Sequence, residues 1–542
     1  MRSTMQSRRF DARQRALFSL RVGAACGVAL LCTRTEATVV PPGGQHALPT
    51  PPPNILLIVL DDIGIENLSF YNYDSQGGCP PVSLPVPPPL LPRSPPPTPR
   101  LTSLASHGVL FSRAYACPYC SVTRATILTG RHAFRTGMGY LADGENYSLP
   151  LSEVTIAEVL KSPAPRPPYR SGAFGKWHLS GASDPVSPHE QGFDVFAVSN
   201  ANLGTGAQGH FGWYLYTDEF SPPTFQTSYS GSVVKQEAEA WIDTVPEPFF
   251  AYVAFHPAHS PFQVPPYGLL STPTRDHIAD LELEDPLHSQ YLEGEDLGFI
   301  PEINPNNEVY APELAYDWMI ESVDTLIGEL IDGIPAGKRS RTTILIVGDN
   351  GTPGMVIEGP HQNPHSKGTP FEQGTRVPFL ASGYKVNDNG LRHEGVVSTT
   401  DLWRTCAALS GSPLPAGVEH DSISLKNVLL TPALDPRPWA FVQVRERFAP
   451  HAPNDPDPLD DPLKTDWRAL NDGTLKYMRR LVWASPQSMP TEQEAAYRLT
   501  DDPTECDDLW PAVVDPSLPW ITQTERDRFL LLKDELLLLS GP

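Results

Sequence analysis

The chain has 542 residues, which is long enough for a large core and more than one domain. Its composition, 40% hydrophobic and 19% charged residues, is typical of globular proteins. The net charge of −23 argues against nucleic acid and anionic membrane surfaces as main partners, and an anionic substrate would need a local basic site.

The N-terminal residues predict export to the periplasm, the outside of the cell or the lumen of the secretory pathway. Arg2, Arg8, Arg9, Arg13 and Arg15 precede an apolar run at 22–32, and small residues around Ala37 offer a cleavage point, so residues 1–37 are interpreted as a signal segment. A disordered basic tail is the alternative. The apolar run is too short to span a bilayer, and no later stretch is long enough, so we expect no integral membrane span. Residues 38–53 are rich in Pro and Gly and are interpreted as a linker.

Two nearly continuous apolar runs predict strands that are buried on both faces of a parallel sheet, at 54–60 and 343–347. Between them, the sequence predicts a Pro-rich exposed insert at 80–97, a helix at 99–107, strands near 172–179 and 249–255, a helix at 232–245, a long acidic loop at 264–310 and a helix at 311–333.

The alternation of strands and helices predicts an α/β domain over residues 54–430. Residues 431–438, TPALDPRP, are a plausible linker, so a smaller domain is predicted over 431–542. The end of the chain, FLLLKDELLLLSG, is typical of a helix followed by a Gly stop.

Oxygen-bearing side chains follow both of the buried strands. Asp61 and Asp62 come directly after the first strand, and Asp349 and Asn350 come after the second. In open α/β sheets, ligand sites gather at the carboxyl ends of strands. Three carboxylates at one point would repel one another without a cation, and calcium takes about six to eight oxygen ligands. The alternative is that D-D and D-N-G are ordinary turns.

Several basic side chains are candidates for binding an anion. Lys176 and His178 lie in GKWHL, and an extended conformation would place both on one face. A cation beside an imidazole suits an oxyanion together with proton transfer. His259 lies in a His-rich and Pro-rich loop after an apolar strand, and Lys367 lies in HSKGT. Each of these residues taken alone is more often an ordinary surface or loop residue.

The stretch at 114–131, AYACPYCSVTRATILTGR, contains Cys117 and Cys120 in a C-x-x-C pattern. Such a pair occurs in thioredoxin-like oxidoreductases, but the Pro-rich insert upstream does not fit the compact context that these enzymes need. The run after Cys120 predicts a short helix closed by Gly130, which places Cys120 at a helix N-terminus. That environment lowers a thiol pKa and favours anions, and Arg124 lies one turn further on. A structural cysteine at an ordinary helix start is the alternative.

These motifs together resemble the type I sulfatases of the alkaline-phosphatase superfamily. The family signature C-x-P-S-R-x-x-L-x-T-G-R is read here as CSVTRATILTGR, at residues 120–131. Further blocks occur in the family's order between residue 53 and about 509: PNILLIVLDDIG, TPRLTSLASHGVLFSRAYA, FGKWHLSG, PHEQGFD, HPAHSPFQVP, VGDNG, KGTPFEQGTRVPF, VSTTDLWRTCAALSG and YRLTDDPTECDDL.

The resemblance implies an arylsulfatase-like enzyme that hydrolyses a small-molecule or glycan sulfate ester. It implies that a separate maturation enzyme, the formylglycine-generating enzyme, oxidises Cys120 to formylglycine, whose hydrated aldehyde is the nucleophile. Arg124 would orient that hydrate, and His178 would take a proton from the sulfated hydrate. The resemblance also implies that Lys176, His259 and Lys367 bind the sulfate group, and that His259 or Lys367 protonates the leaving alcohol. The implied calcium ligands are Asp61, Asp62, Asp349, Asn350 and Cys120 as formylglycine.

The implied fold is a large α/β domain with a mixed central sheet flanked by helices, followed by a smaller α+β domain with a short antiparallel sheet.

Val122 stands where the family motif usually has Pro or Ala. This difference motivates one alternative, a catalytically inactive homologue that still binds sulfate. The other alternative is a phosphonate or phosphodiester hydrolase of the same superfamily, which uses a similar metal and nucleophile.

Overall fold

The computed structural model describes residues 52–71, 94–142, 148–162, 167–181, 187–204, 209–218, 220–284, 312–357, 365–447 and 463–540. The predicted signal segment lies outside the described residues, as do nearly all of the predicted linker and most of the Pro-rich insert. Among the described helices, none is both long enough and apolar enough to cross a membrane.

A mixed sheet of eight strands forms the centre of the large α/β part, as predicted. Its strands, in spatial order, are β10 (Leu391–Ser398), β2 (Gly108–Tyr115), β9 (Phe379–Gly383), β8 (Thr342–Gly348), β1 (Asn54–Leu60), β7 (Phe249–Ala254), β3 (Arg170–Lys176) and β4 (Val195–Ser199). Strand β1 runs parallel to both β7 and β8, whereas β9 is antiparallel to its neighbours β8 and β2.

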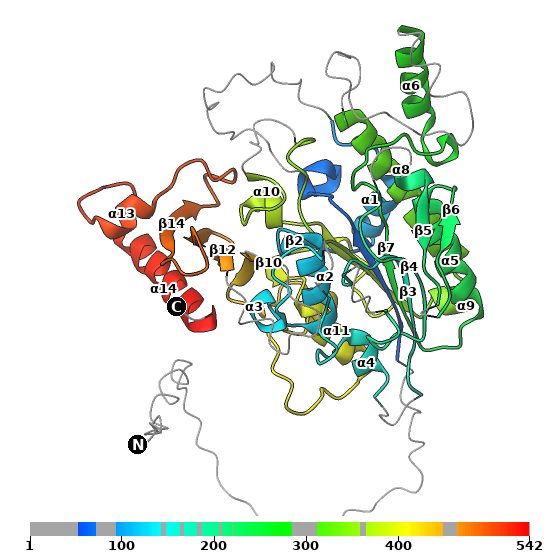
Figure 1. Cartoon of the computed structure of the whole chain (residues 1–542), viewed down its shortest axis with the longest axis horizontal. Coiled ribbons are helices and arrows are strands. Elements are labelled where there is room, and N and C mark those ends of the chain that lie inside the picture. The colour runs from blue at the N-terminus through cyan, green and yellow to red at the C-terminus, as the bar shows by residue number, and fades with distance from the viewer. Residues whose placement is uncertain are drawn as a thin grey trace, which may run out of the picture. The chain divides into compact units, whose positions relative to one another are not determined.

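Helices cover both faces of this sheet, and two hydrophobic cores result. Ile55, Leu57 and Val59 of β1 face one core, while the alternate residues Leu56 and Ile58 face the other. This arrangement explains the continuous apolar run, since a strand covered on both faces has no polar side. Figure 1 shows the helices of the first core, α2 (Cys120–Thr129), α4 (Ile156–Leu160) and α11 (Asp401–Ser410), and those of the second, α1 (Pro99–Ser106), α5 (Ser230–Thr244) and α8 (Pro312–Gly333).

The C-terminal part is an antiparallel sheet covered by a helix, which matches the predicted smaller α+β unit. Its four strands follow one another in chain order: β11 (Ala440–Arg447), β12 (Leu463–Asn471), β13 (Leu475–Val482) and β14 (Thr491–Arg498). Phe529 and Leu536 of α14 (Gln523–Ser540) pack with Phe441 and Tyr477 of the sheet. The boundary at residues 430/431 stays a prediction.

Two expectations for local structure are wrong. The predicted loop at 264–310 contains a helix, α6 (Thr272–Glu284), and the rest of that range from 285 onward lies outside the described residues. Residues 274–284 contain no Pro or Gly, and Ile278 packs against Trp318, so this stretch can form a helix. The strand predicted at 172–179 ends at Lys176, because His178 has a φ of 52° and leaves the extended conformation.

The remaining short elements are α3 (Ala133–Thr136), α9 (Ala336–Arg339), α10 (Glu372–Thr375), α12 (Lys426–Leu430), α13 (Trp510–Val514), the hairpin strands β5 (Trp213–Leu215) and β6 (Thr224–Gln226), and the 3₁₀ helices η2 (Ile65–Asn67), η3 (Ser69–Tyr71), η4 (Gly209–Phe211) and η5 (Tyr267–Leu269). Of these, α10 matters most for the site, because it follows the turn that carries Lys367.

Candidate active site

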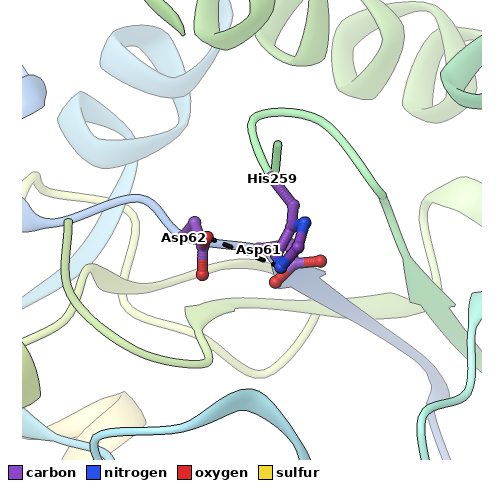
Figure 2. A group of neighbouring side chains, drawn as sticks. All are labelled: Asp61, Asp62 and His259. Atoms are coloured by element: carbon purple, nitrogen blue, oxygen red, sulfur yellow. Dashed lines mark ion pairs between the residues drawn. The ribbon is translucent and has the colours of Figure 1, made fainter. Parts of the chain in front are cut away.

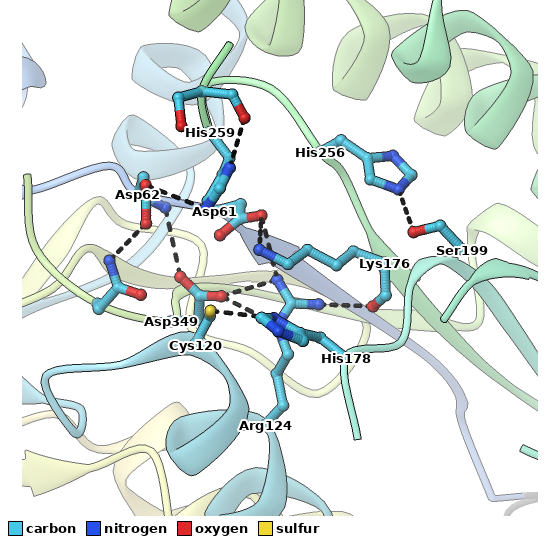
Figure 3. A network of polar contacts seen from close by, with 12 residues as sticks. Asp61, Asp62, Cys120, Arg124, Lys176, His178, Ser199, His256, His259 and Asp349 are labelled. Atoms are coloured by element: carbon cyan, nitrogen blue, oxygen red, sulfur yellow. Dashed lines mark hydrogen bonds and ion pairs between the residues drawn. The ribbon is translucent and has the colours of Figure 1, made fainter. Parts of the chain in front are cut away.

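The candidate site lies at the carboxyl ends of the central parallel strands. Leu60, the last residue of β1, pairs with Gly348, the last residue of β8. The side chains that follow the two strands therefore meet at one edge of the sheet, as the sequence predicted. Figure 3 shows Asp61, Asp62 and Asp349 there, together with side chains from β3, α2 and the loop after β7.

The backbone at Asp62 lets two consecutive carboxylates serve one site. Asp62 has a φ of 63°, a left-handed conformation that turns the chain sharply at the end of β1. Its carbonyl accepts a hydrogen bond from the Tyr316 hydroxyl at 2.7 Å, and its N–H donates to Asp349 Oδ1 at 3.3 Å. Asn350 Nδ2 donates to Asp62 Oδ1 at 2.7 Å. All four predicted oxygen-bearing residues thus lie together, and all are buried.

Cys120 is the first residue of α2, as the sequence predicted, and its side chain is completely buried. The helix ends at Gly130, which has a φ of 68°. His178 Nδ1 lies 3.2 Å from Cys120 Sγ. The other cysteine of the C-x-x-C pattern, Cys117, is a separate free thiol that packs against Val122, so the two do not form a disulfide.

Arg124 lies one turn into α2 and is held by the same cluster. Its Nε and Nη2 donate to Asp349 Oδ2 at 3.0 and 2.7 Å, and Nη1 donates to the Lys176 carbonyl at 2.6 Å. Burial lowers the pKa of Arg124, but the carboxylates of Asp349 and Asp61 outweigh burial, so its pKa is raised overall. The guanidinium is therefore a fixed positive charge with a set orientation.

Three further basic side chains point at the carboxylates. Lys176 Nζ lies 2.6 Å from Asp61 Oδ2, and Lys367 Nζ lies 2.6 Å from Asp62 Oδ1. His259 Nε2 lies 3.8 Å from Asp62 Oδ2 (Figure 2). His259 Nδ1 lies 2.7 Å from the Ser260 carbonyl, which keeps Nε2 turned toward the site. Every catalytic and metal-binding residue predicted from the sequence therefore converges on one buried cluster.

Burial and mutual charge set the protonation of this cluster. Burial raises the pKa of Asp61, but Lys176, His259 and Arg124 outweigh it and hold that pKa well below its usual range. Burial and the Asp61 charge raise the pKa of Asp349 above its usual range, and the Arg124 guanidinium opposes that shift. Burial likewise opposes ionisation of Cys120, yet Lys176 and His178 lower its pKa to about 6. The site therefore stabilises negative charge at residue 120.

The donor set fits a hard divalent cation. Asp61 Oδ1 and Asn350 Oδ1 are buried and have no hydrogen-bond partner among the described residues. Two groups of potential metal ligands share Asp61. The first is Asp61, Asp62 and His259, and the second is Asp61, Cys120 and Asp349; within each group the ligand atoms lie within 4.8 Å of one another. Carboxylate and amide oxygens are the ligands that calcium prefers, and unpartnered buried oxygens are costly unless something binds them.

Comparison with known proteins decides the family. The sulfatase family profile matches residues 53–412, which is most of the chain. The chain belongs to the sulfatase family. It is 28% identical over 400 residues to arylsulfatase A of Homo sapiens, covering 72% of this chain and 70% of the relative. It is 27% identical over 420 residues to N-acetylgalactosamine-6-sulfatase of Sus scrofa, covering 71% and 68%.

Solved structures agree on the fold of this sulfatase. The crystal structure of Ps i-CgsB superposes with a TM-score of 0.62 at 20% identity, covering 90% of this chain and 93% of the other. Family membership and relatives of this kind make the chain a sulfuric ester hydrolase. The resemblance in the motifs and the predicted enzyme class are thus confirmed.

The sulfatase site also contains residues that the sequence did not single out. His210 Nε2 lies 2.9 Å from the His259 carbonyl, and its Nδ1 lies 2.8 Å from Ser230 Oγ. His256 Nε2 lies 2.7 Å from Ser199 Oγ (Figure 3). His256 stands in the same His-rich loop as His259, but nothing in one sequence separates the two. His210 is an isolated histidine, and only the tertiary contact reveals it.

Proposed function

We propose that this sulfatase hydrolyses its sulfate ester with residue 120, oxidised from cysteine to formylglycine, as nucleophile and with a bound calcium ion. The observation that carries the proposal is the position of Cys120. Its sulfur is buried beside His178, while Lys176, Lys367 and three carboxylates occupy the same cluster. A cysteine with only a structural role would not need this concentration of charge.

Asp61, Asp62, Asp349 and Asn350, together with residue 120, would hold the calcium ion. When bound, the ion supplies positive charge to a sulfate group in a protein that is otherwise strongly negative. The unpartnered oxygens of Asp61 and Asn350 support this assignment, because a cation would satisfy both. The same set of carboxylates gives the ion hard oxygen ligands.

Lys176, His259 and Lys367 would bind the sulfate oxygens. In the structure these groups lie against Asp61 and Asp62, so they are already positioned at the cluster. Fixed positive groups stabilise the negative charge that develops in the transition state and do not need to reorganise. Arg124, held by Asp349, would orient the hydrated aldehyde of residue 120.

Two proton transfers complete the proposed cycle. One hydroxyl of the formylglycine hydrate attacks sulfur, and the bond between sulfur and the ester oxygen breaks while His259 or Lys367 protonates the leaving alcohol. His178, 3.2 Å from residue 120, then takes the proton of the remaining hydroxyl, so that sulfate leaves and the aldehyde returns. Addition of water restores the hydrate.

Maturation and location follow from the same proposal. A separate formylglycine-generating enzyme would act on the segment around Cys120 before the protein is active. We propose that the protein is exported through its N-terminal segment, and the disulfide bond at Cys506 supports an oxidising compartment. The division into a catalytic domain at 54–430 and a smaller domain at 431–542 is part of this proposal.

One experiment tests nucleophile and metal together. Protein from its native host is assayed on 4-nitrophenyl sulfate, and the tryptic peptide 114–124 is analysed by mass spectrometry. We expect the aldehyde mass at residue 120, no turnover by Cys120→Ala, and loss of turnover with a calcium chelator that added calcium reverses. An unmodified thiol throughout a fully active preparation would contradict the proposed formylglycine nucleophile.

Full activity after chelation would contradict the proposed calcium requirement. Bis(4-nitrophenyl) phosphate is the comparison substrate, and faster turnover of it would favour a phosphodiesterase.

A further inference from the structure

A buried charged cluster outside the candidate site joins the C-terminal sheet to the large part of the molecule. Lys476 of β13 lies 2.8 Å from Glu372 Oε1 at the start of α10 and 2.8 Å from Glu505 Oε1, beyond β14. The three side chains are 0%, 3% and 1% exposed. Charged side chains are almost never buried so completely unless they are paired, and removal of one partner leaves an uncompensated charge.

Additional bonds fix the cluster to the α10 backbone. Lys476 Nζ donates to the Pro370 carbonyl at 3.0 Å, and Glu505 Oε2 accepts from the Glu372 N–H at 2.5 Å. The Tyr115 hydroxyl donates to Glu372 Oε2 at 3.1 Å. The single ammonium group of Lys476 thus contacts oxygens from both sides of the contact between the C-terminal sheet and α10.

The α10 segment touches two parts of the candidate active site. The Gly351 N–H, one residue after Asn350, donates to the Gly374 carbonyl at 3.0 Å. The Lys367 N–H donates to the Thr352 carbonyl at 3.0 Å, so the turn that carries Lys367 is held between α10 and the end of β8. A shift of α10 would therefore move both Lys367 and the backbone next to Asn350.

The C-terminal part also holds the other end of this segment. His365 Nδ1 lies 3.0 Å from the Thr504 carbonyl, next to Glu505. The His365 ring stacks on Phe371 with centroids 3.7 Å apart, and Phe371 packs edge-on against Trp467 of β12 at 5.7 Å. The residues that flank Lys367 on both sides are thus anchored to the C-terminal part.

We propose that Lys476 is a positioning residue for catalysis. Its ion pairs with Glu372 and Glu505 fix the segment 365–375, and that segment places the Lys367 ammonium group in the active site. The C-terminal sheet thereby sets the position of Lys367 without touching the sulfate ester itself. This inference rests on the proposed role of Lys367. A displacement of about 1 Å at a distance from the chemistry can cost about 100-fold in rate, so the effect is measurable.

A double-mutant cycle tests the inference. Lys476→Met, Lys367→Ala and the double variant are prepared as full chains, and kcat/KM on 4-nitrophenyl sulfate is measured with excess calcium, well below each melting temperature. We expect Lys476→Met to lower kcat/KM by about 10- to 100-fold in the parent. In the Lys367→Ala background we expect a loss of less than about threefold, because residues that act through one another are not additive.

A matched control separates positioning from stability. Arg437 and Asp401 form another buried ion pair, with Arg437 Nε 3.0 Å from Asp401 Oδ2, and neither residue belongs to the 365–375 segment. We expect Arg437→Met to lower the melting temperature while its effect on kcat/KM is small and equal in both backgrounds. If Lys476→Met does not fold, the same cycle with Glu505→Gln decides.

Equal losses in the two backgrounds, or an unchanged kcat/KM in Lys476→Met, would overturn the positioning role alone. Full turnover by Lys367→Ala would contradict the proposed function of Lys367, and this inference would fall with it. The two failures are therefore distinguishable, because the first leaves the Lys367→Ala defect intact.

Discussion

At the scale of single residues, the candidate site is a set of opposite charges that already pair with one another. Lys176 with Asp61, Lys367 with Asp62, and Arg124 with Asp349 each bury a cation against a carboxylate. Unpaired buried charges are very costly, so these pairs let the protein keep ionisable side chains in its interior. A divalent cation and a sulfate group would give both halves of each pair a new partner at little cost in reorganisation.

His178 is the residue whose replacement best tests the proposed second proton transfer. Its Nδ1 is 3.2 Å from residue 120, and a positioned general base contributes about 10²- to 10⁴-fold in rate. We expect His178→Ala to lose turnover on that scale and to accumulate a sulfated form, seen by intact-mass spectrometry after mixing with substrate. The exposed His277 of α6 is the control, and His277→Ala is expected to have no effect. Normal turnover by His178→Ala would contradict the assigned role.

Much of the site was predictable residue by residue, because Asp and Asn at strand ends indicate a metal site and a Cys at a helix start indicates an anion-stabilising position. One expectation about local geometry was wrong. Lys176 and His178 were expected on one face of a strand, but the strand ends at Lys176 and His178 takes a left-handed φ. Likewise, no sequence pattern indicates that Arg124 binds Asp349, since the two are 225 residues apart.

At the scale of elements, the position of α10 against the end of β8 depends on the absence of a side chain at Gly351. A Cβ built there would lie 1.7 Å from the Gln373 carbonyl oxygen, so Gly351→Ala must push the two segments apart. We expect about a 100-fold loss of activity and a higher calcium requirement, because Asn350 is adjacent and small misplacements are costly.

The measurement for Gly351→Ala is initial rate against added calcium, together with the melting temperature. Gly337→Ala in α9 is the control, because a Cβ there meets nothing within 4 Å, and we expect parent behaviour. Parent-like calcium dependence in Gly351→Ala would show that the contact between β8 and α10 has no influence on the site.

Elements were predicted where the hydrophobic pattern was strong. β1 and β8 gave clear signals because both of their faces are buried, and the helices α5 and α8 had apolar stripes. Helix α6 was missed because its charged, mostly exposed surface has little apolar periodicity. The antiparallel placement of β9 between β8 and β2 could not be predicted, since strand order depends on tertiary contacts.

At the scale of the whole molecule, the site is assembled from segments that are far apart in the chain. Asp62 and Asn350 are 288 residues apart yet share a hydrogen bond. The large sheet brings such segments together, and the C-terminal sheet packs beside the large part through side chains such as His132. The His132 ring lies 4.7 Å, centroid to centroid, from that of Phe441 in β11.

His132 predicts a pH dependence of global stability. Burial lowers the pKa of His132 from 6.5 to about 4, although the Asp421 carboxylate opposes this shift. The unfolded chain therefore takes up this proton at a higher pH than the folded protein does. The stabilisation is complete above pH 6.5 and is lost as the pH falls toward 4, by up to about 3 kcal/mol.

The test compares urea unfolding of the parent and His132→Phe between pH 7.5 and 4. We expect the free energy of unfolding of the variant to fall less steeply with decreasing pH, since phenylalanine cannot take up a proton. His277→Phe, at an exposed position, should keep the parent's slope. Parallel slopes for the parent and His132→Phe would contradict a buried neutral His132.

The complete burial of Cys120 has a consequence for how the protein must be made. The thiol has no exposed surface, and neither Val122 nor Arg124 of the same helix has any. Under the proposed mechanism, an oxidising enzyme can reach this sulfur only while the segment is still an extended chain, so oxidation must precede folding. We therefore expect a preparation that folds first to keep the cysteine, and unfolding in the presence of that enzyme to be needed for its conversion.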